Sequence, residues 1–384
     1  MFPPPTGPEL AADLARGLDD IYFASDPLGY FTARISSLLA ERVPEGARDE
    51  TSSAPEPSQF ERLLGEVAKT YRNPTPQARK LQTGIDAFAV RQHAAETLLR
   101  LTYVVLRRRC GRGSPSVWAD VEATPTGMAD VLDGIQECFS KDDRWSLFRD
   151  LVYPPDAADK DDPHVISGVT TFAEWFNFSL ELFARGPLDV SAAHNKFKHG
   201  LGVRVRDDYL VNFATDGPDE HGRVAKSALT GAGAVNVFDR IVLQFLASPG
   251  PRKQGPPLES TTLRISPNVL LAQAALIAHT YAAMFCVAAN THFNTRDSHQ
   301  DDCHDLGDGV RSEAPSAAAY PGLLVDGPLP EHITSSKELI AMRQPLTQRR
   351  DGSAAREAAF FYADGTHQNF RITGPVLTAR VVDG

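Results

Sequence analysis

The stretch Ser191–Val205, SAAHNKFKHGLGVRV, marks the point at which the sequence pattern changes from helical to extended. Before Gly200, alanines and polar residues follow helical spacing, and basic side chains gather toward the end. After Gly200, valine alternates with arginine, as in a β-strand that buries one face. This change predicts a helical domain that ends near His199, followed by a region of mixed helices and strands.

Helical patterns dominate the chain before this point. Residues 1–43 hold two amphipathic patterns that predict a helical pair, and residues 44–58 are acidic and rich in Pro and Ser, as in an exposed linker. The strongest pattern covers residues 83–109, which are apolar around most of a helix and end in a basic turn. We expect this helix at the centre of a helical domain that spans residues 59–199.

Short strand patterns dominate residues 200–384. The segment after Gly200 predicts two strands joined in a hairpin through Asp207 and Asp208, because polar turn residues separate two alternating runs. The patterns together predict an α+β protein that is predominantly α-helical. Its N-terminal helical domain is followed by a mixed region with short antiparallel strands and one long buried helix.

That long helix is the uncharged run from Val269 to Ala289, which is long enough to cross a bilayer. Alanine, Gln273 and His279 dilute its hydropathy, and no Lys or Arg stands immediately at either end. We therefore expect the core helix of a soluble protein with no membrane contact, in preference to a membrane span.

Composition narrows the class of protein further. The 384 residues carry a formal net charge of -10, which argues against a general nucleic-acid coat but leaves room for a local basic groove. The four cysteines lack paired spacing and the N-terminus lacks signal-peptide features, so we expect free thiols in a reducing cytoplasm. The bias toward arginine, alanine, proline and glycine indicates a GC-rich bacterial coding sequence.

The segment HNKFKHG, residues 194–200, concentrates polar side chains at the end of the predicted helix. Asn195 and His199 are four residues apart and Lys196 is three residues before His199, so all three share one face. His194 lies about 140° around the helix from His199 and is expected to point elsewhere. On the central helix, a second polar stripe places Glu96 and Arg100 on one face.

These two motifs resemble the HEPN superfamily, many of whose members are ribonucleases. The family signature is close to RNxxxH, and HNKFKH matches its polar residue at Asn195 and its histidine at His199. The signature arginine is replaced by His194, and Lys196 and Lys198 are candidates to supply the missing cation. The segment ETLLR, from Glu96 to Arg100, is similar to an acidic-basic helix motif of some HEPN families.

The resemblance implies a metal-independent endoribonuclease or an RNA-binding module. His199 would act as general acid or base on the ribose 2′-hydroxyl or the leaving oxygen, and Lys196, Lys198 or Arg100 would stabilise the charge on the phosphoryl group. HEPN enzymes commonly build their site across a dimer, so the resemblance also implies a homodimer that binds RNA.

Two alternatives remain open for the same residues. NKFKHG also has the composition of an ordinary helix C-terminus, in which Lys198 and His199 complement the helix dipole and Gly200 takes the left-handed position. The missing arginine and the acidic net charge are typical of a non-catalytic protein-interaction or scaffold protein, whose partner the sequence does not identify.

A third cluster, in the segment from His292 to Asp305, holds ligand types suitable for zinc: His292, His299, Cys303 and His304. Their spacing matches no zinc finger, HExxH motif or EF-hand loop, and the adjacent aspartates equally suit a solvated acidic loop, so we predict no metal. No phosphate-binding or dinucleotide-binding glycine motif and no nucleophile elbow occurs, so no cofactor is expected.

Overall fold

The structure is a computed structural model, and it describes residues 10–40, 62, 75–125, 127–139, 143–153, 162–184, 190–200, 202–208, 211–214, 234–238, 241–247, 258–294, 340–345, 356–362 and 367–372. The chain divides into two compact units, each assembled from separate stretches. The helical unit comprises Met1–Arg34, Ala89–His194 and Val269–Ser335. The sheet unit comprises Ile35–Phe88, Asn195–Asn268 and Ser336–Gly384.

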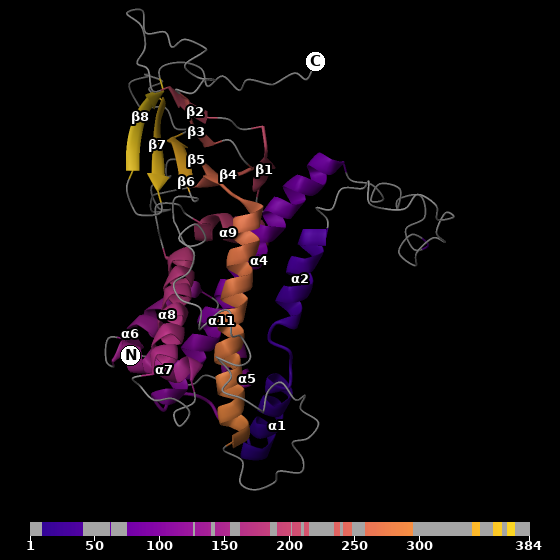
Figure 1. Ribbon diagram of the computed structural model, residues 1–384, viewed down its shortest axis with the longest axis vertical. Coiled ribbons are helices and arrows are strands. Elements are labelled where there is room, and N and C mark those ends of the chain that lie inside the picture. The colour runs from indigo at the N-terminus through magenta and orange to yellow at the C-terminus, as the bar shows by residue number, and fades with distance from the viewer. Residues whose placement is uncertain are drawn as a thin grey trace, which may run out of the picture. The chain divides into compact units, whose positions relative to one another are not determined.

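Helices form the described part of the helical unit (Figure 1). Those that lie wholly within it are α1 (Ala12–Phe23), α5 (Val117–Glu122), α6 (Met128–Phe139), α7 (Arg144–Val152) and α8 (Pro163–Phe183). A boundary between the units falls inside α2 (Gly29–Ala40), α4 (Pro76–Arg109), α9 (Val190–Lys198) and α11 (Pro267–Asn294).

The long helices α4 and α11 pack side by side in the helical unit. Arg91 Nη1 donates to Gln273 Oε1 at 3.1 Å, and Thr102 Oγ1 donates to Met284 Sδ at 3.4 Å. Both contacts join residues 182 positions apart, so the two helices run parallel in a constant register. Their C-terminal ends therefore lie at the same end of the unit, where the α4 arginines Arg107, Arg108 and Arg109 complement the helix dipole.

Helices α6, α7 and α8 bury a cluster of aromatic rings. Phe148 of α7 packs edge-on against Phe139, Phe172 and Phe176, with ring centroids 5.1 to 5.7 Å apart. Such edge-to-face pairs add stability beyond the apolar area that they bury. This cluster holds α8 to α6 and α7 within the helical unit.

A buried carboxylate joins α1 to the beginning of α5. Asp19 is 2% exposed. Its Oδ1 accepts hydrogen bonds from Ser116 Oγ at 2.7 Å and Trp118 N at 3.0 Å, and its Oδ2 accepts one from Val117 N at 2.9 Å. The first backbone N–H groups of a helix lack partners within the helix and carry partial positive charge, so a carboxylate at this position stabilises α5.

The sheet unit contains a six-stranded antiparallel sheet among the described residues (Figure 1). Its strand order is β1 (Arg204–Arg206), β4 (Val242–Ala247), β5 (Glu259–Arg264), β6 (Ile340–Pro345), β7 (Arg356–Tyr362) and β8 (His367–Ile372). Strands β2 (Val211–Ala214) and β3 (Ala234–Phe238) form a separate antiparallel pair. The start of α4 packs in this unit: a Cβ on Gly84 would lie 3.3 Å from Ile241 Cγ2.

The hairpin predicted through Asp207 and Asp208 is wrong. Strand β1 pairs with β4, with Val205 opposite Leu243, whereas β2 pairs with β3. The two aspartates bind neighbours instead of closing a turn. Asp207 accepts a hydrogen bond from Gln77 Nε2 of α4 at 2.5 Å, and Asp208 pairs with Arg206 at 2.8 Å.

The predicted fold class is confirmed: the described residues form an α+β protein that is mostly helical. Helix α11 is long and apolar enough to cross a membrane, but 72% of its most apolar window is buried within the protein, as in the core helix of a soluble protein. Residues 44–58, the predicted linker, lie outside the described residues. The predicted division of the chain into segments 1–43, 59–199 and 200–384 stays a prediction.

Replacing Asp19 tests whether its carboxylate holds α1 to α5. Asp19→Ala leaves two buried backbone donors and a hydroxyl without their acceptor, and we expect it to lower the free energy of unfolding by about 3 kcal/mol. Urea denaturation followed by circular dichroism measures this change. Asp13→Ala, on the exposed side of α1, is the matched control and should cost less than about 1 kcal/mol. Equal losses in the two variants would refute the role of Asp19.

Candidate functional site

The segment that begins with Asn195 forms the end of α9 and an exposed basic surface. Asn195 and His199 are exposed and Lys196 is half-buried. The helical spacing places these three residues on one face, as predicted. His194 is 7% exposed and belongs to the buried side of the helix, which agrees with the expectation that it points away from His199.

Gly200 ends the helix in the left-handed conformation. Its φ is +66°, and its N–H donates to Phe197 O at 3.0 Å. Both features are typical of a helix C-terminus, where a residue with positive φ allows the chain to turn away. Gly202 also has a positive φ of 57°. Two turns therefore carry the chain from the face of Asn195 and His199 into β1.

Strand β1 adds further positive charge to this segment. Eleven consecutive residues of the sheet unit contain five basic side chains: Lys196, Lys198, His199, Arg204 and Arg206. Arg206 is neutralised by Asp208, and this contact holds the pKa of the Asp208 carboxyl below its usual value. In the part of the chain that the structure describes, Lys196, His199 and Arg204 have no carboxylate within ion-pair distance. We call residues 195–206 the basic surface.

Glu96 and Arg100 are brought together on α4, in the helical unit. Arg100 Nε and Nη2 both donate to Glu96 Oε1, at 2.9 and 2.8 Å. Arg100 Nη1 donates to Thr124 Oγ1 at 2.9 Å and to the carbonyl of Pro125 at 2.8 Å. The pair thus fastens the segment after α5 to α4. It lies in a different unit from Asn195, Lys196 and His199, so a joint catalytic role for the five residues stays a prediction.

In the segment from His292 to Asp305, where ligand types suitable for zinc occur but no metal was predicted, the structure describes residues 292–294. His292 lies in α11, where its Nε2 is 2.8 Å from Asp20 Oδ1 and its ring packs near Phe23. His299, Cys303, His304 and Asp305 lie outside the described residues. Within the described ranges, no group of three or more His, Cys, Asp or Glu side chains forms a candidate metal site.

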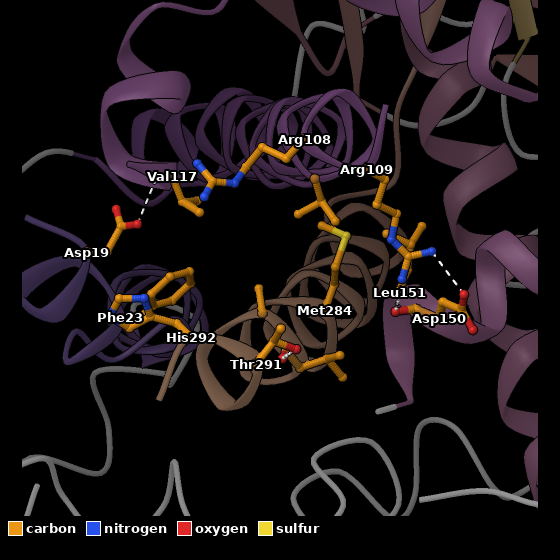
Figure 2. Close-up of a pocket in the computed structure, with 13 residues that line it drawn as sticks. Asp19, Phe23, Arg108, Arg109, Val117, Asp150, Leu151, Met284, Thr291 and His292 are labelled. Carbon is orange, nitrogen blue, oxygen red and sulfur yellow. Dashed lines mark hydrogen bonds and ion pairs between the residues drawn. The ribbon is translucent and has the colours of Figure 1, made fainter. Parts of the chain in front are cut away.

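A pocket that sequence patterns did not predict lies at the shared C-terminal end of α4 and α11 (Figure 2). Its volume is about 390 Å³, and all of its lining residues belong to the helical unit. Its walls are mostly apolar and come from α1, α4, α5, α7 and α11; they include Phe23, Val105, Val117, Leu151, Met284 and Val287.

Charged and polar groups lie at the edges of this pocket. In Figure 2, Arg108 and Arg109 enter from the end of α4, and His292 lies on the side opposite Arg109. Arg109 is bound to Asp150 through Nη1 at 3.1 Å and to the Asp150 carbonyl through Nη2 at 2.9 Å. This end of α4 carries the run RRRCGR, residues 107–112. From the sequence alone, such a run indicates only a solvated basic helix end, not the wall of a pocket.

Gly111 and Arg112 close the end of α4 beside the pocket. Gly111 has φ +68°, its N–H donates to Arg108 O, and Arg112 N–H donates to Arg107 O. These are the two hydrogen bonds of a Schellman motif, which turns the chain back at the end of a helix. The motif directs the chain from the last turn of α4 toward α5, whose first residue, Val117, lines the pocket.

Comparison of the chain with known protein families, curated proteins and solved structures finds no match. Its function must therefore be inferred from the basic surface, the pocket and the chemistry of their residues.

Because His292 is partly buried, we expect the free energy of unfolding to depend on pH. Burial is the main cause that lowers the pKa of His292, with smaller contributions from Arg108 and Arg16; Asp19 opposes the shift, and so does the contact of Nε2 with Asp20. The unfolded chain then binds the proton more readily, so stability should fall as the pH drops below about 6.5 and stop falling below the lowered pKa. Urea midpoints for the wild type and His292→Leu between neutral and acidic pH measure the effect. A slope unchanged by the substitution would contradict it.

Proposed function

We propose that the protein binds single-stranded RNA through the basic surface, residues 195–206. One observation carries the proposal. A chain with a net charge of -10 collects Lys196 and Arg204, together with the exposed His199, in one short segment where neither cation forms an ion pair with a carboxylate of the described residues. Cations without a protein partner are available to phosphate groups, which supply most of the affinity of proteins for nucleic acids.

Phe197 supports the choice of a single strand over a duplex. Its half-buried ring lies between Lys196 and Lys198 in the chain. Proteins that bind single strands combine cations for the phosphates with aromatic rings on which unpaired bases stack. The resemblance of Asn195 and His199 to the HEPN signature favours RNA over DNA. A cytoplasmic location and a bacterial source form part of this proposal, and Cys110, Cys138 and Cys286 are free thiols.

The enzymatic form of the proposal assigns cleavage to His199. In that form His199 is general acid or base, Asn195 positions the substrate, and Lys196 stabilises the phosphoryl charge without a metal. Arg100 is less suited to that last role because its guanidinium already makes four hydrogen bonds, to Glu96, Thr124 and Pro125. Glu96 then acts as the partner that orients Arg100. A homodimer would bring two copies of His199 to one site.

A non-catalytic protein-interaction or scaffold role is the alternative. It is favoured by Leu14 and Ile21, which are 55% and 64% exposed and lie seven residues apart on one side of α1. Exposed apolar side chains on one helical face are typical of a protein contact surface. A protein of this kind would not bind RNA through the basic surface.

Fluorescence anisotropy with a labelled single-stranded RNA, measured over a series of salt concentrations, tests the binding. The double variant Lys196→Gln, Arg204→Gln removes two phosphate contacts and should lower the slope of log affinity against log salt by about 1.4. Arg34→Gln, an exposed arginine of α2, is the matched control and should leave the slope unchanged. Equal affinity for the wild type and the double variant would reject the basic surface and favour the scaffold role.

Cleavage is tested separately, by incubating RNA with wild type and with His199→Ala in the presence of a chelator. The enzymatic form predicts that His199→Ala binds RNA but no longer cleaves it. Cleavage that survives the substitution would reject the role of His199. Binding without cleavage by the wild type would leave the RNA-binding module as the function, and sedimentation analysis of the same samples tests the homodimer.

A further inference from the structure

The pocket at the C-terminal ends of α4 and α11 has the construction of a small-molecule site. A volume of about 390 Å³ lies within the range of ligand pockets, which combine apolar walls with a few polar groups. At the density of liquid water, where one molecule takes about 30 Å³, this volume holds about a dozen non-hydrogen atoms. The parallel register of α4 and α11 supplies two of its walls, through Val105 on one helix and Met284 and Val287 on the other.

The carboxylates around the pocket are already engaged. Asp19 accepts hydrogen bonds from Ser116, Val117 and Trp118. Asp150 is bound by Arg109 and also by Arg149, whose Nε and Nη2 donate to it at 3.0 and 2.7 Å. Because these carboxylates are compensated by protein donors, they hold little attraction for a cationic ligand.

Arg108 is the polar group that remains available. Its Nη1 donates to Ser114 O at 2.7 Å and contacts Asp120 Oδ2 at 3.3 Å. Its Nε and Nη2 have no partner among the residues that the structure describes, and the side chain is 31% exposed. These two nitrogens form one edge of the planar guanidinium, whose parallel N–H groups match the two oxygens of a carboxylate.

The loop after α4 holds Arg108 in this orientation. A Cβ on Gly113 would overlap Arg108 Cγ and lie 2.9 Å from Asp120 Oδ2. Ser114 N donates to both oxygens of Asp120 at 2.9 Å, which fixes the carboxylate that Arg108 contacts. Glycine is therefore required for the loop to pack against the arginine, and the guanidinium is positioned before any ligand arrives.

We propose that the pocket binds a small organic acid with an apolar body. Its carboxylate occupies the Nε and Nη2 edge of Arg108, and its body packs against Phe23, Met284 and Val287. Arg109 takes no direct part because its Nη1 and Nη2 are bound to Asp150. This site belongs to the helical unit, and it is independent of the RNA-binding function proposed for residues of the sheet unit.

Isothermal titration calorimetry of the full chain tests the site, with octanoate and naphthoate as acids and octanol as the uncharged counterpart of octanoate. We expect at least one acid to bind with one-to-one stoichiometry, and octanoate to bind about tenfold or more tightly than octanol. Failure of both acids to bind, or equal binding of octanoate and octanol, would overturn the proposal.

Two variants locate the binding within the pocket. Arg108→Gln should weaken the binding of the acids about tenfold or more and leave octanol unaffected, whereas the matched control Arg34→Gln, at an exposed arginine that does not line the pocket, should change both by less than about threefold. Ala288→Phe fills the pocket from α11 and should abolish binding of acids and alcohol alike. Circular dichroism establishes that each variant is folded. Acids that bind folded Ala288→Phe with unchanged affinity would place the site elsewhere and refute the proposal.

Discussion

Helices α4 and α11 set the constraint on which the helical unit depends, because both are apolar around most of their circumference and must be covered on several sides. Their parallel register, fixed by the contacts of Arg91 with Gln273 and of Thr102 with Met284, places their C-terminal ends together. That arrangement brings Arg108 and His292 to one end of the unit. The pocket is thus a consequence of how two core helices pair, and Asp19 secures one of its walls by holding α5 to α1.

The elements most accurately predicted from the sequence are those whose signal is local. The apolar periodicity of α4 and α11 and the alternation in β1 depend on residues close together in the chain, and the structure confirms each as an element. Strand pairing was predicted wrongly for β1 because its partner, β4, begins at Val242, far along the chain. A turn signal such as Asp207–Asp208 indicates a change of direction but does not identify the strand that pairs next.

The same distinction applies to the candidate sites. The shared face of Asn195 and His199 and the helix end at Gly200 could be predicted, because helical geometry relates residues three to five positions apart. The ion pair of Glu96 with Arg100 follows the same rule, although its contacts with Thr124 and Pro125 do not. The pocket could not be predicted, since Phe23, Arg108, Leu151 and His292 come from four helices that only the tertiary fold brings together.

The basic surface and the pocket differ in the physical basis of their recognition. Lys196 and Arg204 offer positive charges to a polyanion, whose attraction is strong but screened by salt. Arg108 offers a single oriented guanidinium within apolar walls, where a directed pair of hydrogen bonds selects one small anion. The two features lie in different units, and each can act as a binding site without a contribution from the other.

Ultraviolet crosslinking of the full chain to single-stranded RNA, with the modified residues located by mass spectrometry, identifies the residues that contact RNA. We expect the crosslinked residues to cluster within residues 195–206, with Phe197 among them because a stacked base lies against its ring. Crosslinks confined to the helical unit, or none at low salt, would contradict the assignment of RNA binding to the basic surface.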